Sequence, residues 1–225
     1  MKIGFCIYSL LLGLSLTYPP TRTNSLNSTD TFINAIRLTN EYFPIENKQL
    51  KYESNFGDVS LNIDKDNQYN VFTLEGDNFL YRQKLLVNDK GVFVKEVYQK
   101  VRVFLIINQE ESFTYSELFP RIKLPLTDGK TWNWEGQEIM ENEINTINLS
   151  ATVIGIEKVK VPAGSFEAVK VQTNITSTSG SKNIVNEWYA KNIGMVKMTA
   201  KLEGGGLVGT FRDLLGYGEL IFELK

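Results

Sequence analysis

The sequence contains no histidine, and its only cysteine is Cys6. Without histidine the chain cannot build Ser-His-Asp catalysis, histidine acid–base chemistry, or the usual zinc and non-haem iron sites. Cys6 lies within the N-terminal leader predicted below. We therefore expect the rest of the chain to have no disulfide framework, thiol nucleophile or thiolate metal site. We expect no cofactor, so any chemistry would depend on carboxylate, lysine, tyrosine, serine or threonine side chains.

A strongly basic surface is also missing. The 225 residues carry a formal net charge of −2, and no run of lysine or arginine interrupts them. Phosphate backbones and anionic membrane surfaces both attract basic proteins, so we predict no nucleic-acid partner and no electrostatic attraction to membranes. With 42% hydrophobic and 22% charged residues, the composition is that of an ordinary globular protein. Composition leaves the oligomeric state open.

The N-terminus has the pattern of an export signal. Lys2 precedes an apolar segment, residues 3–16, which is too short to span a bilayer but typical of a signal peptide. We predict a signal peptide at residues 1–17, and a linker or short helix at residues 18–40, where threonine, asparagine and serine are frequent. A buried N-terminal strand or a retained anchor is the alternative. The mature protein is expected in the periplasm or outside the cell, with no transmembrane span.

Residues 41–225 show the alternation and the turn signals of β-structure. Short runs of β-branched and aromatic residues alternate with turns rich in glycine, asparagine and aspartate. This pattern predicts a single all-β domain, an antiparallel β-barrel or strongly curved half-barrel of about ten to twelve strands. A weak similarity between residues 43–53 and 124–135 suggests two repeated modules, at residues 42–120 and 121–225.

Two consecutive hairpins occupy residues 150–203. The turn Val161–Gly164 combines Pro162, which fixes φ at the second turn position, with a glycine that can adopt positive φ. The strand that follows alternates cleanly and presents one face. This face consists of Val169, Val171, Thr173 and Ile175. Upstream, the apolar residues change parity, which predicts a β-bulge near Glu157–Lys158.

These hairpins carry a family resemblance. The segment Val161-Pro162-Ala163-Gly164-Ser165-Phe166, followed by Trp188-Tyr189-Ala190 and Gly194-Met195-Val196-Lys197, resembles a signature of exported bacterial β-proteins of unknown function. Those proteins are more distantly similar to the half-barrel carriers typified by the Lol lipoprotein chaperones. The resemblance implies a curved β-sheet and export, and it transfers no functional residue to this chain.

Tryptophans are the candidate ligand-binding residues. Trp132 and Trp134 share one face of a strand, and we expect Trp188 to join them. Aromatic side chains on one face can line an apolar ligand cavity, although they more often form plain core. We predict no catalytic residue and no metal site.

Two groups of acidic residues are candidates for a calcium site or a catalytic site. Asp64 and Asp66 alternate as in a calcium loop, but the glycine and the closing glutamate are missing, so a polar hairpin turn is favoured. After the Trp132–Trp134 strand comes an acidic cluster. It consists of Glu135, Glu138, Glu141 and Glu143. Paired carboxylates near tryptophans would suit a glycosidase or lyase.

The sequence thus favours an exported, non-enzymatic binding or carrier protein for a lipid or another apolar ligand. An envelope structural or interaction protein that docks a partner through its sheet is the first alternative. A carboxylate-based glycosidase or lyase is the second.

Overall fold

Twelve antiparallel strands make up almost all of the described structure. The computed structural model describes residues 41–43, 48–103, 107–204 and 218–225. The predicted signal peptide (1–17) and linker or helix (18–40) lie outside these residues. The strands are β1 (Gln49–Ser54), β2 (Gly57–Asp66), β3 (Tyr69–Gly76), β4 (Phe79–Asn88), β5 (Gly91–Val103), β6 (Ile107–Lys123), β7 (Thr131–Ile139), β8 (Ile144–Val161), β9 (Gly164–Ser177), β10 (Ser181–Ala190), β11 (Gly194–Gly204) and β12 (Glu219–Leu224). No helix within the described ranges has the length and apolar character to cross a membrane.

The strands form a closed barrel. Each strand pairs with its sequence neighbours, and β1 closes the ring by pairing with β12, where Tyr52 lies opposite Leu224. The prediction of an all-β antiparallel barrel of ten to twelve strands is confirmed, and the ring is closed rather than a half-barrel. Whether the two halves are repeats stays a prediction. The proposed module boundary at residue 121 falls inside β6.

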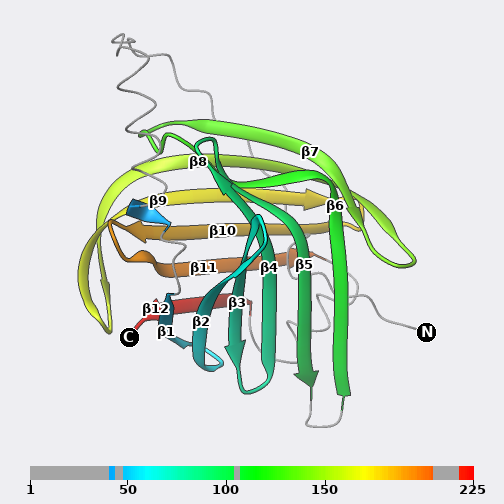
Figure 1. The fold of residues 1–225 in the computed structure, drawn as a ribbon, viewed down its shortest axis with the longest axis horizontal. Coiled ribbons are helices and arrows are strands. Elements are labelled where there is room, and N and C mark those ends of the chain that lie inside the picture. Colours follow the sequence, from blue (N-terminus) through cyan, green and yellow to red (C-terminus); the bar gives the residue numbers. More distant parts are fainter. Residues whose placement is uncertain (1–40, 44–47, 104–106, 205–217) are drawn as a thin grey trace.

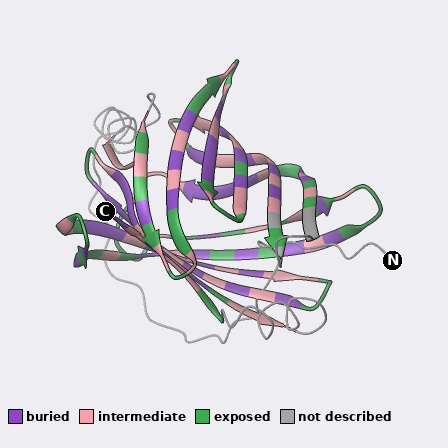
Figure 2. Cartoon of the chain, turned by 90° about the horizontal axis from the view of Figure 1, so that it is seen from below, coloured by how far each residue is buried: buried purple, intermediate pink, exposed green. Residues whose placement is uncertain are grey.

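The core lies between two halves of the barrel that cross one another. In Figure 1, β2 to β6 run up and down the view, whereas β7 to β12 run across it. Along many strands, buried and more exposed residues alternate, as the bands in Figure 2 show. This period-two pattern places one set of side chains in the barrel interior and the other on the outer wall. The interior is filled mainly by aliphatic and aromatic side chains from all twelve strands.

The hairpin of β8 and β9 confirms most of its sequence prediction. The turn joins Val161 to Gly164, whose φ is +138°, and the predicted apolar face of β9 is buried. The bulge, however, lies between Val153 and Gly155 rather than near Glu157–Lys158. Parity misplaced it because Ile154 and Ile156 are 46% and 69% exposed, so these two apolar side chains do not mark a buried face.

One pair of strands meets only briefly. β6 and β7 share two paired positions, Thr114 with Ile139 and Tyr115 with Glu138. Beyond them, side chains join the two strands. Trp132 Nε1 donates to the Pro120 carbonyl at 3.1 Å, and the backbone N–H of Gln137 donates to Ser116 Oγ at 2.9 Å. We call this region the β6–β7 seam.

Gly91, at the start of β5, is required by both its backbone and its neighbours. Its φ is +147°, and a Cβ there would lie 2.0 Å from the Ile122 carbonyl oxygen. We expect Gly91→Ala to lower the free energy of unfolding by about 2–4 kcal/mol, measured by urea denaturation. Gly57, with φ +118° and no atom within 4 Å of its would-be Cβ, is the control. Gly57→Ala should cost only about 1–2 kcal/mol, and equal costs would contradict the steric argument.

Candidate ligand-binding site

A shallow pocket lies at the end of the barrel where β12 stops short. β12 pairs with β1 only from Tyr52 to Ser54, and with β11 only from Lys197 to Lys201. The pocket lies beside these pairings, between the first residues of β1 and those of β11. Across its base, Tyr52 Oη donates a 2.7 Å hydrogen bond to the Met195 carbonyl, which holds the two strands together.

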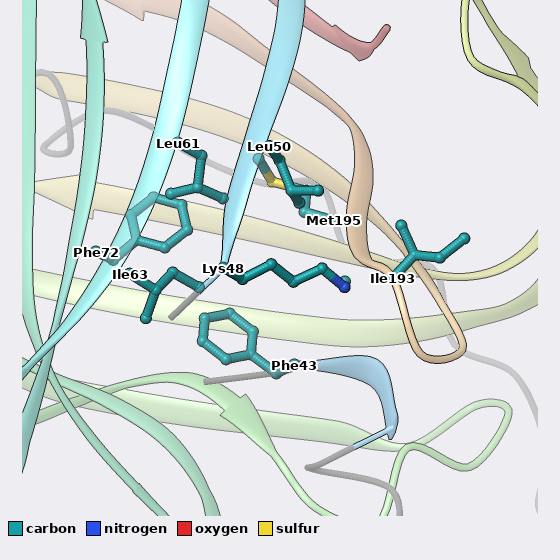
Figure 3. A pocket seen from close by; sticks show the side chains of 9 residues that line it. Phe43, Lys48, Leu50, Leu61, Ile63, Phe72, Ile193 and Met195 are labelled. Carbon is teal, nitrogen blue, oxygen red and sulfur yellow. The ribbon is translucent and has the colours of Figure 1, made fainter. Parts of the chain in front are cut away.

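The wall of this pocket is almost entirely apolar. Its lining residues are Phe43, Lys48, Leu50, Leu61, Ile63, Phe72, Ile193, Gly194 and Met195. Figure 3 shows their side chains gathered around one space, with the Lys48 chain crossing it. The volume is about 250 Å³ when the solvent at its open mouth is included. The pocket is therefore a shallow, open depression that could contact one end of a ligand rather than enclose a whole lipid.

Phe43 forms one side of the pocket, and contacts of the neighbouring Glu41 hold it there. The backbone N–H of Asn192 donates to the Glu41 carbonyl, and Lys191 Nζ lies 3.2 Å from the Glu41 carboxylate. These contacts place Phe43 against two buried rings. Its centroid lies 6.3 Å from that of Phe72 and 6.1 Å from that of Tyr189. An aromatic layer thus separates the pocket from the barrel interior.

Lys48 is the only ionisable residue in the lining. Its Nζ donates a 2.9 Å hydrogen bond to the Asn192 carbonyl across the pocket. Burial lowers the pKa of Lys48 below its usual value of 10.5. The lowering follows from desolvation of a charge that, among the residues the structure describes, forms no ion pair.

Behind the aromatic layer lies a buried ion pair. Glu187 Oε1 accepts from Arg121 Nη2 at 2.6 Å and from Arg121 Nε at 3.1 Å, and Arg121 Nη1 donates to Gln83 Oε1 at 2.7 Å. The Arg121 guanidinium also lies over the Phe72 ring, 4.7 Å from its centroid, and 5.6 Å from that of Phe43. Because both rings line the pocket, the ion pair supports its wall from inside.

Neither Arg121 nor Glu187 was among the predicted site residues, although the sequence pattern around Glu187 is informative. Glu187 shares the inward parity of Val185 and Tyr189, so a carboxylate interrupts an otherwise apolar face. Such a residue needs a buried cationic partner. Arg121 left no such signal, because a register shift between β5 and β6 near Val92 determines its inward direction.

The structure places Trp132 and Trp134 on the inner face of the barrel. They lie opposite Ala151 and Leu149, both buried, and Trp132 is only 5% exposed. Trp134 packs edge-on against Tyr115, with ring centroids 5.6 Å apart. A Cβ at Gly136 would lie 2.3 Å from the Trp134 ring, so that glycine makes room for the indole. Neither tryptophan lines the pocket described above. Both lie at the β6–β7 seam.

Trp188 does not join the other two tryptophans, so the prediction that they share a face is wrong. Trp188 lies between Lys170 and Lys197 on the outer wall of the barrel, where these two lysines lie over its ring and leave it only 7% exposed. Its ring lies 4.7 Å from Lys170 Nζ, and its Nε1 donates to Glu157. The three tryptophans come from strands that are not neighbours, and parity within one strand does not fix its phase relative to another.

The acidic candidates do not converge. Glu138 is buried and Glu135 is exposed, since three positions along β7 place them on opposite faces. Asp66 ends β2 beside the turn to β3 and forms an ion pair with Lys84 at 2.9 Å, so the favoured polar turn is confirmed. Within the described residues, no three carboxylate, histidine or cysteine side chains are grouped to hold a metal ion.

Comparison with known families supports the resemblance at a coarse level. The sequence is similar to the DUF3108-like family over residues 123–211, less than half of the chain. The matched part contains the Val161–Phe166 turn and the Gly194–Lys197 segment that carry the resemblance. The more distant likeness to Lol-type carriers stays a prediction. No curated protein matches the sequence significantly.

Three solved structures resemble the barrel at low identity. The hypothetical lipoprotein YmcC from Escherichia coli (K12) is 13% identical with a TM-score of 0.41, over 90% of this chain and 97% of that one. A Bacteroides fragilis protein, described as exported with a YmcC-like fold, is 16% identical with a TM-score of 0.41, over 82% and 97%. One from Parabacteroides distasonis, described as a lipoprotein, is 12% identical with a TM-score of 0.38, over 82% and 97%.

Removing one partner of the buried ion pair should lower the free energy of unfolding far more than replacing both partners. We expect Glu187→Met to destabilise the protein by about 3–5 kcal/mol, because it leaves the Arg121 charge uncompensated. The double variant Arg121→Met/Glu187→Met should recover much of that loss in urea denaturation. The Lys197–Glu223 pair has the same 2.6 Å separation on the outer wall and serves as control. Glu223→Met should cost less than about 1 kcal/mol. Equal costs at the two sites would contradict the role of burial.

Tyr52 should make stability sensitive to alkaline pH. Burial raises the pKa of Tyr52 above its usual value of 10, so the folded state keeps the phenol neutral while the unfolded chain ionises. The Tyr52 contribution is therefore complete below about pH 10 and declines by up to about 1.4 kcal/mol per pH unit above it. At pH 8, Tyr52→Phe should cost about 1 kcal/mol. By pH 11 this difference from the wild type should vanish or reverse, and a constant difference would refute the assignment.

Proposed function

We propose that the protein is a binding protein for an apolar or amphiphilic ligand, one part of which enters the pocket between β1 and β11. The observation that carries the proposal is the pocket lining. Seven apolar side chains and one glycine surround an open space at the end of the barrel. Burying apolar ligand surface there would contribute about 25 cal/mol per Å².

The shape of the pocket restricts the kind of ligand that it could bind. The pocket is shallow, and its space of about 250 Å³ includes solvent at the open mouth. A ligand would therefore place only a short hydrocarbon segment in it and leave the remainder outside. This supports binding or transient capture at the barrel end.

Export belongs to the same proposal. The apolar segment at residues 3–16, preceded by Lys2, supports a signal peptide and hence a location in the periplasm or outside the cell.

A docking role is the alternative with an observation of its own. Ile139 and Ile144 pair at the tip of the β7–β8 hairpin and are 37% and 61% exposed. An exposed apolar tip of this kind could contact a partner protein. The carboxylate-enzyme hypothesis receives no comparable support, since Glu135 and Glu138 lie on opposite faces of β7.

The proposal is tested by titrating the detergent-free protein with 1-octanol in a calorimeter. Burial of about six methylene groups at about 0.8 kcal/mol each predicts a Kd of roughly 0.1–1 mM. Ile193→Asp, which introduces a charge into the pocket wall, should weaken binding at least about tenfold. Ile156→Asp is the matched control, because Ile156 is 69% exposed and outside the pocket. No octanol binding, or an equal loss in both variants, would reject the proposal.

A further inference from the structure

We propose that the pocket takes the carboxylate end of a medium-chain carboxylic acid, with Lys48 Nζ paired to the carboxylate and the first part of the chain against the apolar wall. This inference names the ligand class of the proposed function and rests on it. Lys48 is the only charged residue among the nine that line the pocket.

The position of the Lys48 ammonium supports an anionic partner. Its side chain crosses the pocket, and Nζ donates to the Asn192 carbonyl, which uses one of its three donors. Among the described residues no carboxylate pairs with it, and burial already lowers its pKa, so its charge is incompletely compensated. A ligand carboxylate would supply that compensation in a site partly shielded from water.

Two other cations near the pocket already have carboxylate partners. Lys191 Nζ lies 3.2 Å from the Glu41 carboxylate. Arg121 is 5% exposed, pairs with Glu187, and lies behind the rings of Phe43 and Phe72. A ligand in the pocket would meet those rings rather than the guanidinium. Lys48 is therefore the cation that would select the head group, while the apolar wall would select the chain.

The pocket is shallow and open at its mouth, so only a short part of the chain would lie against the apolar wall. Octanoate is the probe, and 1-octanol and octylamine are neutral and cationic analogues of the same length.

The experiment compares the three probes on wild-type protein, Lys48→Met and Lys130→Met by calorimetry. Methionine keeps the length and apolar stem of lysine and removes its charge. Lys130 is the matched control. Burial also lowers its pKa, and its Nζ also donates to a backbone carbonyl, that of Leu124, but it lies outside the pocket lining.

In the wild type, octanoate should bind about fivefold more tightly than octanol, and octylamine should bind more weakly than octanol. The ion pair contributes only this modest advantage because the mouth of the pocket is open to solvent. Lys48→Met should remove the octanoate advantage while leaving octanol affinity within about twofold, whereas Lys130→Met should change neither. High salt should reduce the advantage of octanoate. Equal affinities of octanoate and octanol in the wild type, or an octanoate advantage that survives Lys48→Met, would overturn the inference and leave the proposed function intact.

The NMR signal of a methionine methyl group distinguishes failure of the Lys48 inference from failure of the proposal that the pocket binds a ligand. Met195 lines the pocket, whereas Met140 lies in the β7–β8 loop. With ¹³C-methyl methionine, octanoate should shift the Met195 signal and leave that of Met140 unchanged. Absence of any Met195 shift with both octanoate and octanol would reject the proposed function together with the inference.

Discussion

The buried pair of Arg121 and Glu187 is the constraint on which much of this barrel depends. Each charge would carry a desolvation cost of several kcal/mol alone, so the two must remain in contact across the interior. They connect β6 with β10, strands from the two crossing halves of the barrel. Through the rings of Phe43 and Phe72, the same guanidinium also supports the pocket wall. The packing of the two halves and the geometry of the pocket wall therefore share one electrostatic contact.

The site lies beside the pairings of β12 with its two neighbours. β12 pairs with β1 over Tyr52–Ser54 and with β11 over Lys197–Lys201, and the pocket lies next to the first residues of β1 and β11. There, side chains rather than strand pairing form the surface. Apolar residues from β1, β2, β3 and the β10–β11 turn do so. A candidate binding site can thus form at the barrel end from side chains of separate strands.

Much of the fold could be predicted from the sequence, because strand alternation and turn chemistry are local properties. The Val161–Gly164 turn and the buried face of β9 depend only on neighbouring residues, and both predictions are confirmed. The site was less accessible to such reasoning. Trp188 faces outward although Trp132 faces inward, since the relative phase of distant strands is set by register. The pocket depends on where β12 ends relative to β1, which no local pattern encodes.

Closing the ring through Tyr52 and Leu224 has a consequence for the order of folding. Eleven of the twelve strand pairings join neighbours in sequence, so hairpins can form as the chain emerges. The last pairing spans about 170 residues, and bringing such ends together costs about 4–5 kcal/mol of loop entropy. Until it forms, the outer edge of β1 is an open template for other strands. The state most prone to pairing with other chains is therefore the one in which β12 has not yet docked, because β1 and β11 then both expose an unpaired edge.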